Sequence, residues 1–333
     1  MEDTDKKPIH LGLLIPKEKK KKIKLPERIA DLCLKENIKI TEVDIHGDLE
    51  SQGPFDVFFH KVVDIHKDGL SLEETENLIQ KTVEYSKRHP EMVVVDDFEV
   101  VIKLMKRQYQ VEILNQCSMT VDGVSVYVPT TVEIPGNTAL DVCRELIERS
   151  GIKFPILAKP LASCLDGAHD MKIIFSDEKL FDLPVPCLLQ EFCNHGGVIY
   201  KVFVIGDRVS MCERPSIQNI DCDPNQPSLV FDTRNVSKTG RAFIPELHGT
   251  DPNARAWLSG EENPNMLNKT VIQAIVERLS KVTRFRMYGF DILKDLEGNY
   301  ALVDLNHFPG YSGISDETFK RDVVNMIKSC AGL

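Results

Sequence analysis

Apolar residues in the first hundred positions alternate between strand-like and helix-like spacing. Short apolar runs predict strands at 10–15, 38–45, 55–61 and 93–95. Helical spacing predicts two intervening helices, at 26–36 and 71–89, and the second begins at Ser71, which can form a capping box with Glu74. This alternation is typical of a small open α/β module, whose ligand site lies at the carboxyl ends of parallel strands. Lys61 ends one of these strands.

The pattern changes near residue 116, where apolar runs become shorter and Pro and Gly more frequent. It predicts a sheet-rich α+β region with strands at 154–160, 171–175, 186–192, 198–205 and 209–214. The segment 221–265 is rich in Pro, Gly, Asn and Asp and weak in periodicity, so we interpret it as loops. We expect a helix at 266–282, then two strands, and a last helix from about residue 315.

The net charge, the length of the apolar runs and the cysteine spacing limit the functions and locations that we expect for this chain. The 333 residues contain 41 Lys and Arg against 51 Asp and Glu, a net charge of -10 that disfavours nucleic-acid binding through overall charge. No apolar run is long enough to cross a bilayer, and the first ten residues lack the apolar core of a signal peptide. The nine cysteines include no C-x-x-C pair, which favours reduced thiols. We therefore expect a cytoplasmic protein that binds neither membranes nor nucleic acid. As a separate expectation, we take it to be a monomer.

The clearest candidate for a chemical site lies between residues 288 and 311. Apolar strands at 288–294 and 300–305 flank a turn, which predicts a hairpin. If the loop holds an even number of residues, directly paired positions sum to an odd number, and Asp291, Asp304 and Asn306 share one face. Two carboxylates and an amide oxygen suit Mg²⁺. The alternative is an exposed acidic face, which the apolar flanks disfavour.

Three separate cations form the second candidate feature. Lys159 and Lys201 interrupt apolar strands, and Arg107 is expected to end a helix. An unpaired ammonium inside a sheet is costly, so each lysine needs an anionic partner. An acidic neighbour such as Glu191 or Glu213 would supply a plain ion pair. Two lysines on neighbouring strands, upstream of a predicted Mg²⁺ hairpin, favour nucleotide phosphates instead.

A run rich in lysine at 17–24 directly follows the first strand. Most such runs are solvated surfaces or nuclear-import signals. Here the run would place several point charges at the strand-end crevice, which suits a polyphosphorylated ligand. Lys61, at the end of another strand, favours this second interpretation.

Five motifs together resemble one known family, the inositol 1,3,4-trisphosphate 5/6-kinases, also called inositol-tetrakisphosphate 1-kinases, of the ATP-grasp superfamily. They are GPFDVFFHKVVD at 53–64, QEFCNHGGVIYKVFVIG at 190–206, ERPS at 213–216, NVSK at 235–238 and DLNHFPGYSG at 304–313. The resemblance runs nearly end to end. It implies an α/β and α+β chain with an ATP-grasp fold, in which a Rossmann-like pre-ATP-grasp domain at 1–115 contributes to inositol phosphate binding. A central subdomain at 116–192 and a C-terminal subdomain at 193–333, which carries the hairpin, would complete it.

The resemblance also implies roles for individual residues. ATP would be bound by Arg107, Lys159, the stretch 190–201 with Gln190, Glu191, Phe192 and Lys201, and by Ser216 and Ser237. The inositol phosphate would contact Lys20, Lys61, His169, Lys201, Asn306 and Gly310, with Lys19 almost as good a match as Lys20. Two Mg²⁺ ions would be held by Asp291, Asp304 and Asn306. Lys159, Lys201 and Asp304 would carry the catalysis.

One position departs from the animal-type family pattern. Those members carry A-H-G-x-x-x-H, whereas this chain has Cys164 where the first histidine would stand. A thiol offers a phosphate neither the charge nor the hydrogen-bond geometry of an imidazole. The departure concerns the acceptor, and it leaves the ATP and metal residues intact.

The resemblance implies phosphoryl transfer from ATP to a ring hydroxyl of an inositol polyphosphate, catalysed by positioning and charge neutralisation. Two other functions remain open. An ATP-grasp ligase that joins a carboxylate to an amine would use the same nucleotide and metal residues, although Lys20 and Lys61 exceed the needs of one carboxylate. A non-catalytic inositol phosphate sensor is supported by Cys164 and opposed by the intact Asp291, Asp304 and Asn306.

Overall fold

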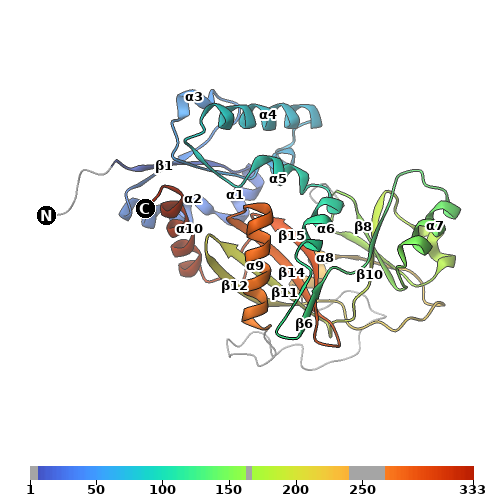
Figure 1. Cartoon of the computed structure of the whole chain (residues 1–333). Helices are drawn as coiled ribbons and strands as arrows, with labels where there is room; N and C mark the ends of the chain where they lie inside the picture. Colours follow the sequence, from blue (N-terminus) through green and yellow to red (C-terminus); the bar gives the residue numbers. More distant parts are fainter. Residues whose placement is uncertain (1–6, 163–166, 240–266) are drawn as a thin grey trace.

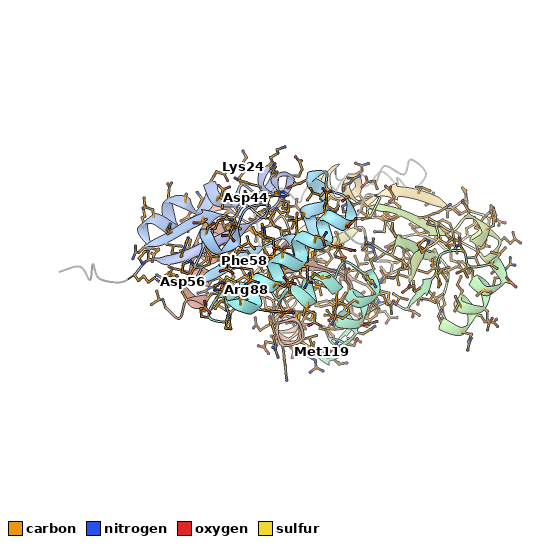
Figure 2. The ribbon with its side chains drawn as sticks, turned by 90° about the horizontal axis from the view of Figure 1, so that it is seen from above. Lys24, Asp44, Asp56, Phe58, Arg88 and Met119 are labelled. Carbon is orange, nitrogen blue, oxygen red and sulfur yellow. The ribbon has the colours of Figure 1, made fainter. Side chains whose placement is uncertain are left out.

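The computed structural model describes residues 7–162, 167–239 and 267–333. Three sheets lie in a row along the molecule (Figure 1). Seen from above, the N-terminal sheet with its helices occupies one end, and the sheet that carries α7 occupies the other (Figure 2). None of the helices in these ranges is long and apolar enough to span a membrane.

The N-terminal sheet is parallel, with strand order β2-β1-β3-β4, and confirms the predicted open α/β module. Its strands are β1 (Ile9–Leu14), β2 (Ile38–Glu42), β3 (Val57–His60) and β4 (Val93–Val95), and its longer helices are α2 (Leu25–Lys35) and α4 (Leu72–Arg88). The short helix α3 (Leu49–Gln52) and the 3₁₀ turns η1 (Val62–Asp68) complete it. Ser71 and Glu74 form the predicted capping box at the start of α4.

The second sheet has the strand order β13-β9-β8-β10-β7 and is antiparallel. Its strands are β7 (Thr131–Ile134), β8 (Ile156–Pro160), β9 (Asp170–Ile174), β10 (Cys187–Glu191) and β13 (Leu229–Asp232), with η2 (Asp177–Asp182) beside them. Helix α7 (Leu140–Ser150) covers one face, because Cys143 and Ile147 pack among Ile156 and Leu189.

The third sheet has the order β12-β11-β14-β15-β6-β5. Its strands are β5 (Met119–Val121), β6 (Val124–Tyr127), β11 (Val198–Ile205), β12 (Arg208–Pro215), β14 (Met287–Lys294) and β15 (Tyr300–His307). Helix α9 (Lys269–Thr283) buries Ile275 and Leu279 in the largest core cluster. The last helix, α10 (Asp316–Cys330), packs against α2, so both ends of the chain share one core.

Several predictions about elements were wrong. Arg107 begins α6 (Arg107–Asn115) after α5 (Phe98–Lys103) has ended, rather than ending a helix. The segment 221–265 contains β13 and α8 (Thr233–Thr239) within its described part, because Leu229 and Phe231 alternate into a buried cluster. The lysine run, for which no element was predicted, forms helix α1 (Lys17–Ile23), and Ile23 packs into the core.

The sheets also cross the subdomain boundary expected at residue 192. Strands β5 and β6 precede it but pair with the sheet that contains β14 and β15. Strand β13 follows it but pairs with β9. Strands from either side of this boundary thus pair in each of the two sheets, which both contribute residues to the cavity described below.

Candidate active site

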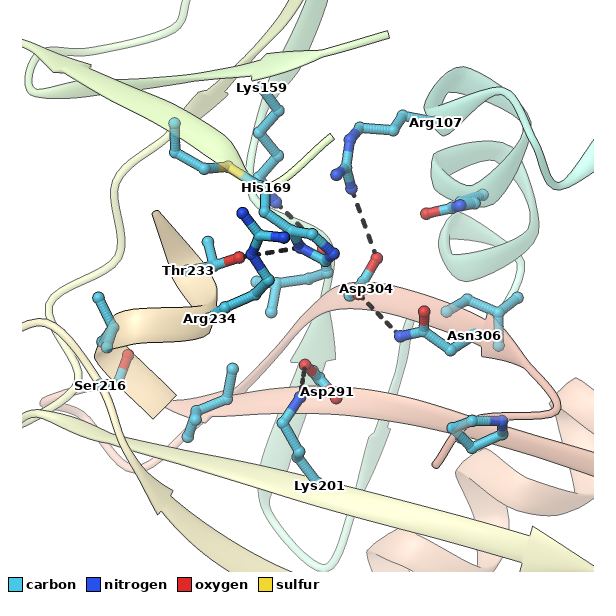
Figure 3. Close-up of a pocket in the computed structure, with 18 of the residues that line it drawn as sticks. Arg107, Lys159, His169, Lys201, Ser216, Thr233, Arg234, Asp291, Asp304 and Asn306 are labelled. Carbon is cyan, nitrogen blue, oxygen red and sulfur yellow. Dashed lines mark hydrogen bonds and ion pairs between the residues drawn. The ribbon is translucent and has the colours of Figure 1, made fainter. Parts of the chain in front are cut away.

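A cavity of about 500 Å³ lies where the three sheets meet (Figure 3). Strand ends of the N-terminal sheet contribute Lys61, the second sheet contributes Lys159, and the third contributes Lys201 and the acidic hairpin. The predicted residues that line this cavity are Lys61, Arg107, Lys159, His169, Gln190, Glu191, Phe192, Lys201, Ser216, Asp291, Asp304, Asn306 and Gly310. The structure thus brings residues separated by up to 249 positions into one place.

The acidic hairpin is formed by β14 and β15. Asp291 lies directly opposite Asp304, and Gly289 lies opposite Asn306, so the three polar side chains share one face. The condition for this prediction was wrong, because the loop 295–299 holds five residues rather than an even number. A bulge between the two strands restores the register: Ile292 pairs with Leu302, so Val303 is the extra residue.

Cations surround the two carboxylates. Lys201 lies opposite Asp291 on the neighbouring strand, and its Nζ donates to Asp291 Oδ2 at 2.5 Å. Arg107 Nη1 is 3.6 Å from Asp304 Oδ1, and the guanidinium also donates to the carbonyls of Pro160 and Ala168. The ion-pair partner of Lys201 is thus the hairpin itself, rather than Glu191 or Glu213.

Lys159 is placed differently from Lys201. Its Nζ donates to the carbonyl of Val303, the bulged residue, at 3.2 Å. Burial, together with the charge of Arg107, lowers the pKa of Lys159 to about 8, and the carboxylates of Asp304 and Asp291 oppose this shift. The ammonium is therefore a buried charge that an additional anion in the cavity would stabilise.

The carboxylates respond to the same environment. Burial and the charge of Asp304 raise the pKa of Asp291, against the opposing effect of Lys201. Burial also acts to raise the pKa of Asp304, but Arg107 and Lys159 outweigh it and lower that pKa. For Lys201, burial acts to lower the pKa, but Asp291 outweighs it and raises it. Positively and negatively charged side chains thus alternate across the site and stabilise one another.

The donor set fits Mg²⁺ bound together with phosphates. Asn306 Nδ2 donates to Asp304 Oδ2 at 2.8 Å, which leaves Asn306 Oδ1 available as a ligand. In the described ranges no three His, Cys, Asp or Glu side chains gather as a metal cluster. Two carboxylates and one amide oxygen leave room in the coordination sphere, which suits an ion that takes its other ligands from water and phosphate.

The N-terminal module supplies lysines at the other end of the cavity. Lys61 is only 8% exposed, and its Nζ donates to the carbonyl of His307, directly after Asn306. From the lysine run, Lys19 lines the cavity, whereas Lys20 forms an ion pair with Glu42. The structure therefore favours Lys19 over Lys20 for the position that faces a ligand.

The remaining predicted residues lie along the wall opposite the hairpin. Gln190 and Glu191 end β10 and Phe192 follows, while Ser216 follows β12. His169 Nδ1 lies 3.2 Å from the hydroxyl of Thr233, which joins β9 to the start of α8. Ser237 lies in α8, but its side chain lies outside the described part, as does Cys164.

Two residues of this wall were given no role of their own from the sequence: His195 was included only as part of the stretch 190–201, and Arg234 was missed. His195 hydrogen-bonds to Ser216, and Arg234 lines the cavity beside His169 while it pairs with Asp232 (Figure 3). His195 stands inside the motif at 190–206 and Arg234 directly precedes NVSK. Neither residue follows a spacing that identifies a function, so the only available signal was position within a motif for His195 and next to a motif for Arg234.

The comparison with known domains decides the family. Residues 121–329 match the inositol 1,3,4-trisphosphate 5/6-kinase ATP-grasp domain, and residues 11–101 match the pre-ATP-grasp domain of the same kinases. The chain belongs to the inositol 1,3,4-trisphosphate 5/6-kinase family. This confirms the resemblance that the five motifs indicated.

Curated relatives extend the match over most of the chain. A Danio rerio protein named inositol-tetrakisphosphate 1-kinase is 30% identical over 328 residues, covering 96% of this chain and 78% of that protein. A Glycine max protein named inositol-tetrakisphosphate 1-kinase 2 is 27% identical over 307 residues, covering 90% of both chains. The sequence similarity to these kinases thus extends over the segments that form all three sheets.

Solved structures confirm the ATP-grasp fold. A RiPP-associated ATP-grasp ligase from Chryseobacterium gregarium, in complex with ADP and a leader and core peptide, matches with a TM-score of 0.60 at 12% identity, over 96% of this chain and 97% of that one. D-cycloserine synthetase matches with a TM-score of 0.59 at 11% identity, over 96% and 99%. At these identities the similarity concerns the fold alone.

Proposed function

We propose that this protein is a kinase that transfers the γ-phosphoryl group of ATP to a hydroxyl group of an inositol polyphosphate. The observation that carries this proposal is the shared cavity. One end presents Lys61 and Lys19 from the N-terminal module, and the other presents Lys159 and Arg107 beside the acidic hairpin. Two separate groups of cations suit two phosphorylated ligands that meet at the hairpin. Family membership supports the same reaction.

The nucleotide would occupy the wall between the second and third sheets. Its phosphates would lie against Arg107, Lys159 and Lys201, since these cations converge on the hairpin. Its base and ribose would lie against the end of β10 and the segment after β12. The complete proposed set is Arg107, Lys159, Gln190, Glu191, Phe192, Lys201, Ser216 and Ser237.

Asp291, Asp304 and Asn306 would hold two Mg²⁺ ions with the nucleotide phosphates. Their facing positions across β14 and β15 support a preformed site. When bound, the ions neutralise charge on the β- and γ-phosphates as the phosphoryl group moves. Asp291 would exchange Lys201 for metal, which places the Lys201 ammonium near the transferring group.

The inositol phosphate would enter beside the N-terminal module. Lys61, Lys19, His169, Lys201, Asn306 and Gly310 are the proposed contacts, with Lys19 taking the place first expected for Lys20. Asn306 lies between the two ligands, because it shares the hairpin face with Asp304 and precedes the residue whose carbonyl holds Lys61. The acceptor hydroxyl would therefore reach the γ-phosphate at this point.

Catalysis would depend on position and charge rather than on a protein nucleophile. Lys159 and Lys201 would offset the charge that develops on the oxygens of the phosphoryl group, and Asp304 would position the metal and Arg107.

The test is incubation of the purified protein with Mg²⁺, ATP and a panel of inositol phosphates, followed by separation of products by isomer. We expect ADP and a more highly phosphorylated inositol that form in equal amounts. Binding of both ligands without turnover would instead indicate a sensor. ADP formation that requires a carboxylate and an amine would indicate a ligase.

A further inference from the structure

Arg234 adds one more cation to the cavity wall. It lies in the first turn of α8, directly after β13, and lines the cavity. Figure 3 shows its side chain beside that of His169. Within the described part of the chain it forms no ion pair with either carboxylate of the acidic hairpin. Arg234 therefore stands apart from the cations that converge on the hairpin.

The backbone that carries Arg234 is fixed on both sides. Val236, two positions further along, is 6% exposed and belongs to the same buried cluster as Phe231 of β13. On the other side, the Thr233 amide donates to the carbonyl of His169 at 3.1 Å, and the Thr233 hydroxyl lies 3.2 Å from Nδ1 of that histidine. The start of α8 is therefore anchored to the end of β13 and to His169.

Asp232 fixes the orientation of the guanidinium. Its carboxylate accepts from the Arg234 amide at 2.8 Å, from Nε at 3.0 and 2.9 Å, and from Nη2 at 2.5 Å. A guanidinium has five N–H donors in one plane, and these bonds use one on Nε and one on Nη2. Both hydrogens of Nη1 and the second hydrogen of Nη2 remain for another acceptor. Since the side chain is 58% exposed, a ligand can reach them.

Arg234 also supplies the positive charge at this part of the wall. Burial and the charge of Arg234 lower the pKa of His169, against the opposing effect of Asp232. The imidazole is therefore neutral near pH 7 and offers a phosphate no positive charge. A guanidinium, by contrast, is always charged and binds phosphate oxygens through parallel N–H bonds.

Resting on the proposed function, we infer that Arg234 binds one phosphate group of the inositol polyphosphate and selects acceptors that carry a phosphate at that ring position. The Nη1 side of the guanidinium donates to this phosphate, while Asp232 keeps the Nε side. Lys61 and Lys19 bind other phosphates from the N-terminal module. The acceptor is thus held by cations of two different modules, and the nucleotide phosphates occupy the separate group of cations at the hairpin.

The test compares inositol 1,3,4-trisphosphate with the three bisphosphates that each lack one of its phosphates, the 3,4-, 1,4- and 1,3-isomers. Affinities are measured by calorimetry in the presence of Mg²⁺ and saturating ADP. In Arg234→Gln we expect the affinity for the trisphosphate to fall by about three- to tenfold, since solvent partly screens a charged contact at this exposure. The affinity for one bisphosphate should stay unchanged, because that isomer lacks the phosphate that Arg234 binds.

Arg208→Gln is the matched control for the loss of one positive charge. The Arg208 side chain is 60% exposed, close to the 58% of Arg234, and it also pairs with a nearby aspartate, Asp207. It is not among the residues that line the cavity. This variant should bind all four inositol phosphates as the wild-type protein does. Both variants should keep the wild-type affinity for ADP and the wild-type thermal midpoint.

Four results would overturn the inference alone. They are an unchanged trisphosphate affinity in Arg234→Gln, an equal loss for all four inositol phosphates, and an equal loss in Arg208→Gln, which would indicate a general effect of charge. The fourth is a lower ADP affinity in Arg234→Gln, which would assign the arginine to the nucleotide. Absence of inositol phosphate binding to the wild-type protein would overturn the proposed function together with this inference.

Discussion

The buried cations of the cavity differ in how their charges are balanced. Lys201 has the carboxylate of Asp291 at 2.5 Å, whereas Lys159 donates to a neutral carbonyl and has a pKa lowered to about 8. A phosphate that reached Lys159 would therefore relieve an existing desolvation cost. Lys201 must first exchange its carboxylate partner. Both lysines interrupt apolar strands, but in the structure their ammonium groups have different partners, a carbonyl for Lys159 and a carboxylate for Lys201.

Asp304→Asn should abolish phosphoryl transfer while the fold remains intact. The change preserves shape but removes the charge that balances Arg107 and that would hold the metal. Turnover at saturating Mg²⁺ and the thermal midpoint are the measurements. Near-normal turnover by a folded variant would contradict the metal assignment.

Lys61→Ala should weaken inositol phosphate binding more than tenfold and leave ATP affinity unchanged. Lys61 belongs to the N-terminal module, and a charged hydrogen bond to phosphate contributes about 1.5 to 3 kcal/mol. Calorimetry with each ligand measures the effect. Lys20→Ala is a matched control, because Lys20 pairs with Glu42 and should leave both affinities unchanged.

Cys164→His should restore a charge-assisted donor to the acceptor phosphate, if this position serves here as it does in the family pattern. The expected result is a lower KM for the inositol phosphate at an unchanged KM for ATP, since the change concerns one ligand. The double variant Cys164→His with Leu165→Gly also restores the neighbouring glycine. Unchanged acceptor kinetics in both variants would show that the position makes no substrate contact.

Among the elements, the acidic hairpin shows what a strand pattern can and cannot predict. Alternation was enough to place Asp304 and Asn306 on one face, because side chains on one strand alternate with period two. Their alignment with Asp291 depended on the number of residues between the strands. The loop holds five residues, and a bulge at Val303 supplies the shift of one residue that brings Asp304 opposite Asp291. No residue type in this stretch indicates that bulge.

The bulge can be tested by changing its length. Deletion of Val303 should close the bulge and keep Asp291 opposite Asp304, since Ile292 and Leu302 already pair. Insertion of one alanine after Val303 should move Asp304 out of its position opposite Asp291. We expect Mg²⁺-dependent turnover to persist at a lower rate in the deletion, which loses the Val303 carbonyl that accepts from Lys159, and to vanish in the insertion. Equal activities in the two variants would show that register does not position the metal ligands.

Other elements were missed for identifiable reasons. Helix α7 carries Leu140, Cys143 and Ile147 at helical spacing, but strand-like runs on both sides dominated the interpretation. The segment around β13 was dominated by Pro, Asn and Asp, although Leu229 and Phe231 alternate as strand residues do. Local composition outweighed short periodic signals in both places.

At the scale of the whole molecule, Asp96 links the N-terminal sheet to the hairpin. It follows β4, is 1% exposed, and accepts from the backbone amides of Arg286 and Met287, where β14 begins, at 2.5 and 3.1 Å. Its carboxylate also lies 3.5 Å from His307. One buried side chain thus links the N-terminal module to the acidic hairpin.

The buried carboxyl of Asp96 predicts a pH dependence of stability. Burial raises its pKa from 3.8 to about 7, so the folded state binds this proton more tightly than the unfolded state. The stability that Asp96 contributes is therefore fully present below pH 3.8 and is lost as the pH rises to about 7. Asp96→Asn stays neutral, so its thermal midpoint should fall less between pH 4 and 7 than that of wild type.

A control is needed because His60 acts in the opposite direction. Burial lowers the pKa of His60 to about 4, so its contribution to stability increases between about pH 4 and 6.5. His60 is present in both proteins, so its own contribution cancels in the difference between wild type and Asp96→Asn. Parallel midpoints across this range would contradict the assignment.

The family motifs predicted the fold and most residues of the cavity, whereas the link through Asp96 could not be predicted. Motifs report residues that are close in sequence, such as Asp304 and Asn306. Asp96 and Arg286 are 190 positions apart, and no spacing relates them. The same holds for the preference of the cavity for Lys19 over Lys20, which the rotation of α1 decides.

The pairing of β6 with β15 has a consequence for the order in which the chain is made. On the side of β6 that faces away from β5, Val126 and Tyr127 pair with Tyr300 and Ala301. At typical rates of translation, roughly 10 to 35 s pass between the synthesis of the two segments. During that interval the edge of the β5–β6 hairpin is a bare strand inside a growing chain. The acidic hairpin is therefore synthesised late, after most of the other residues that line the cavity. A nascent chain that stops before residue 287 lacks both of its strands.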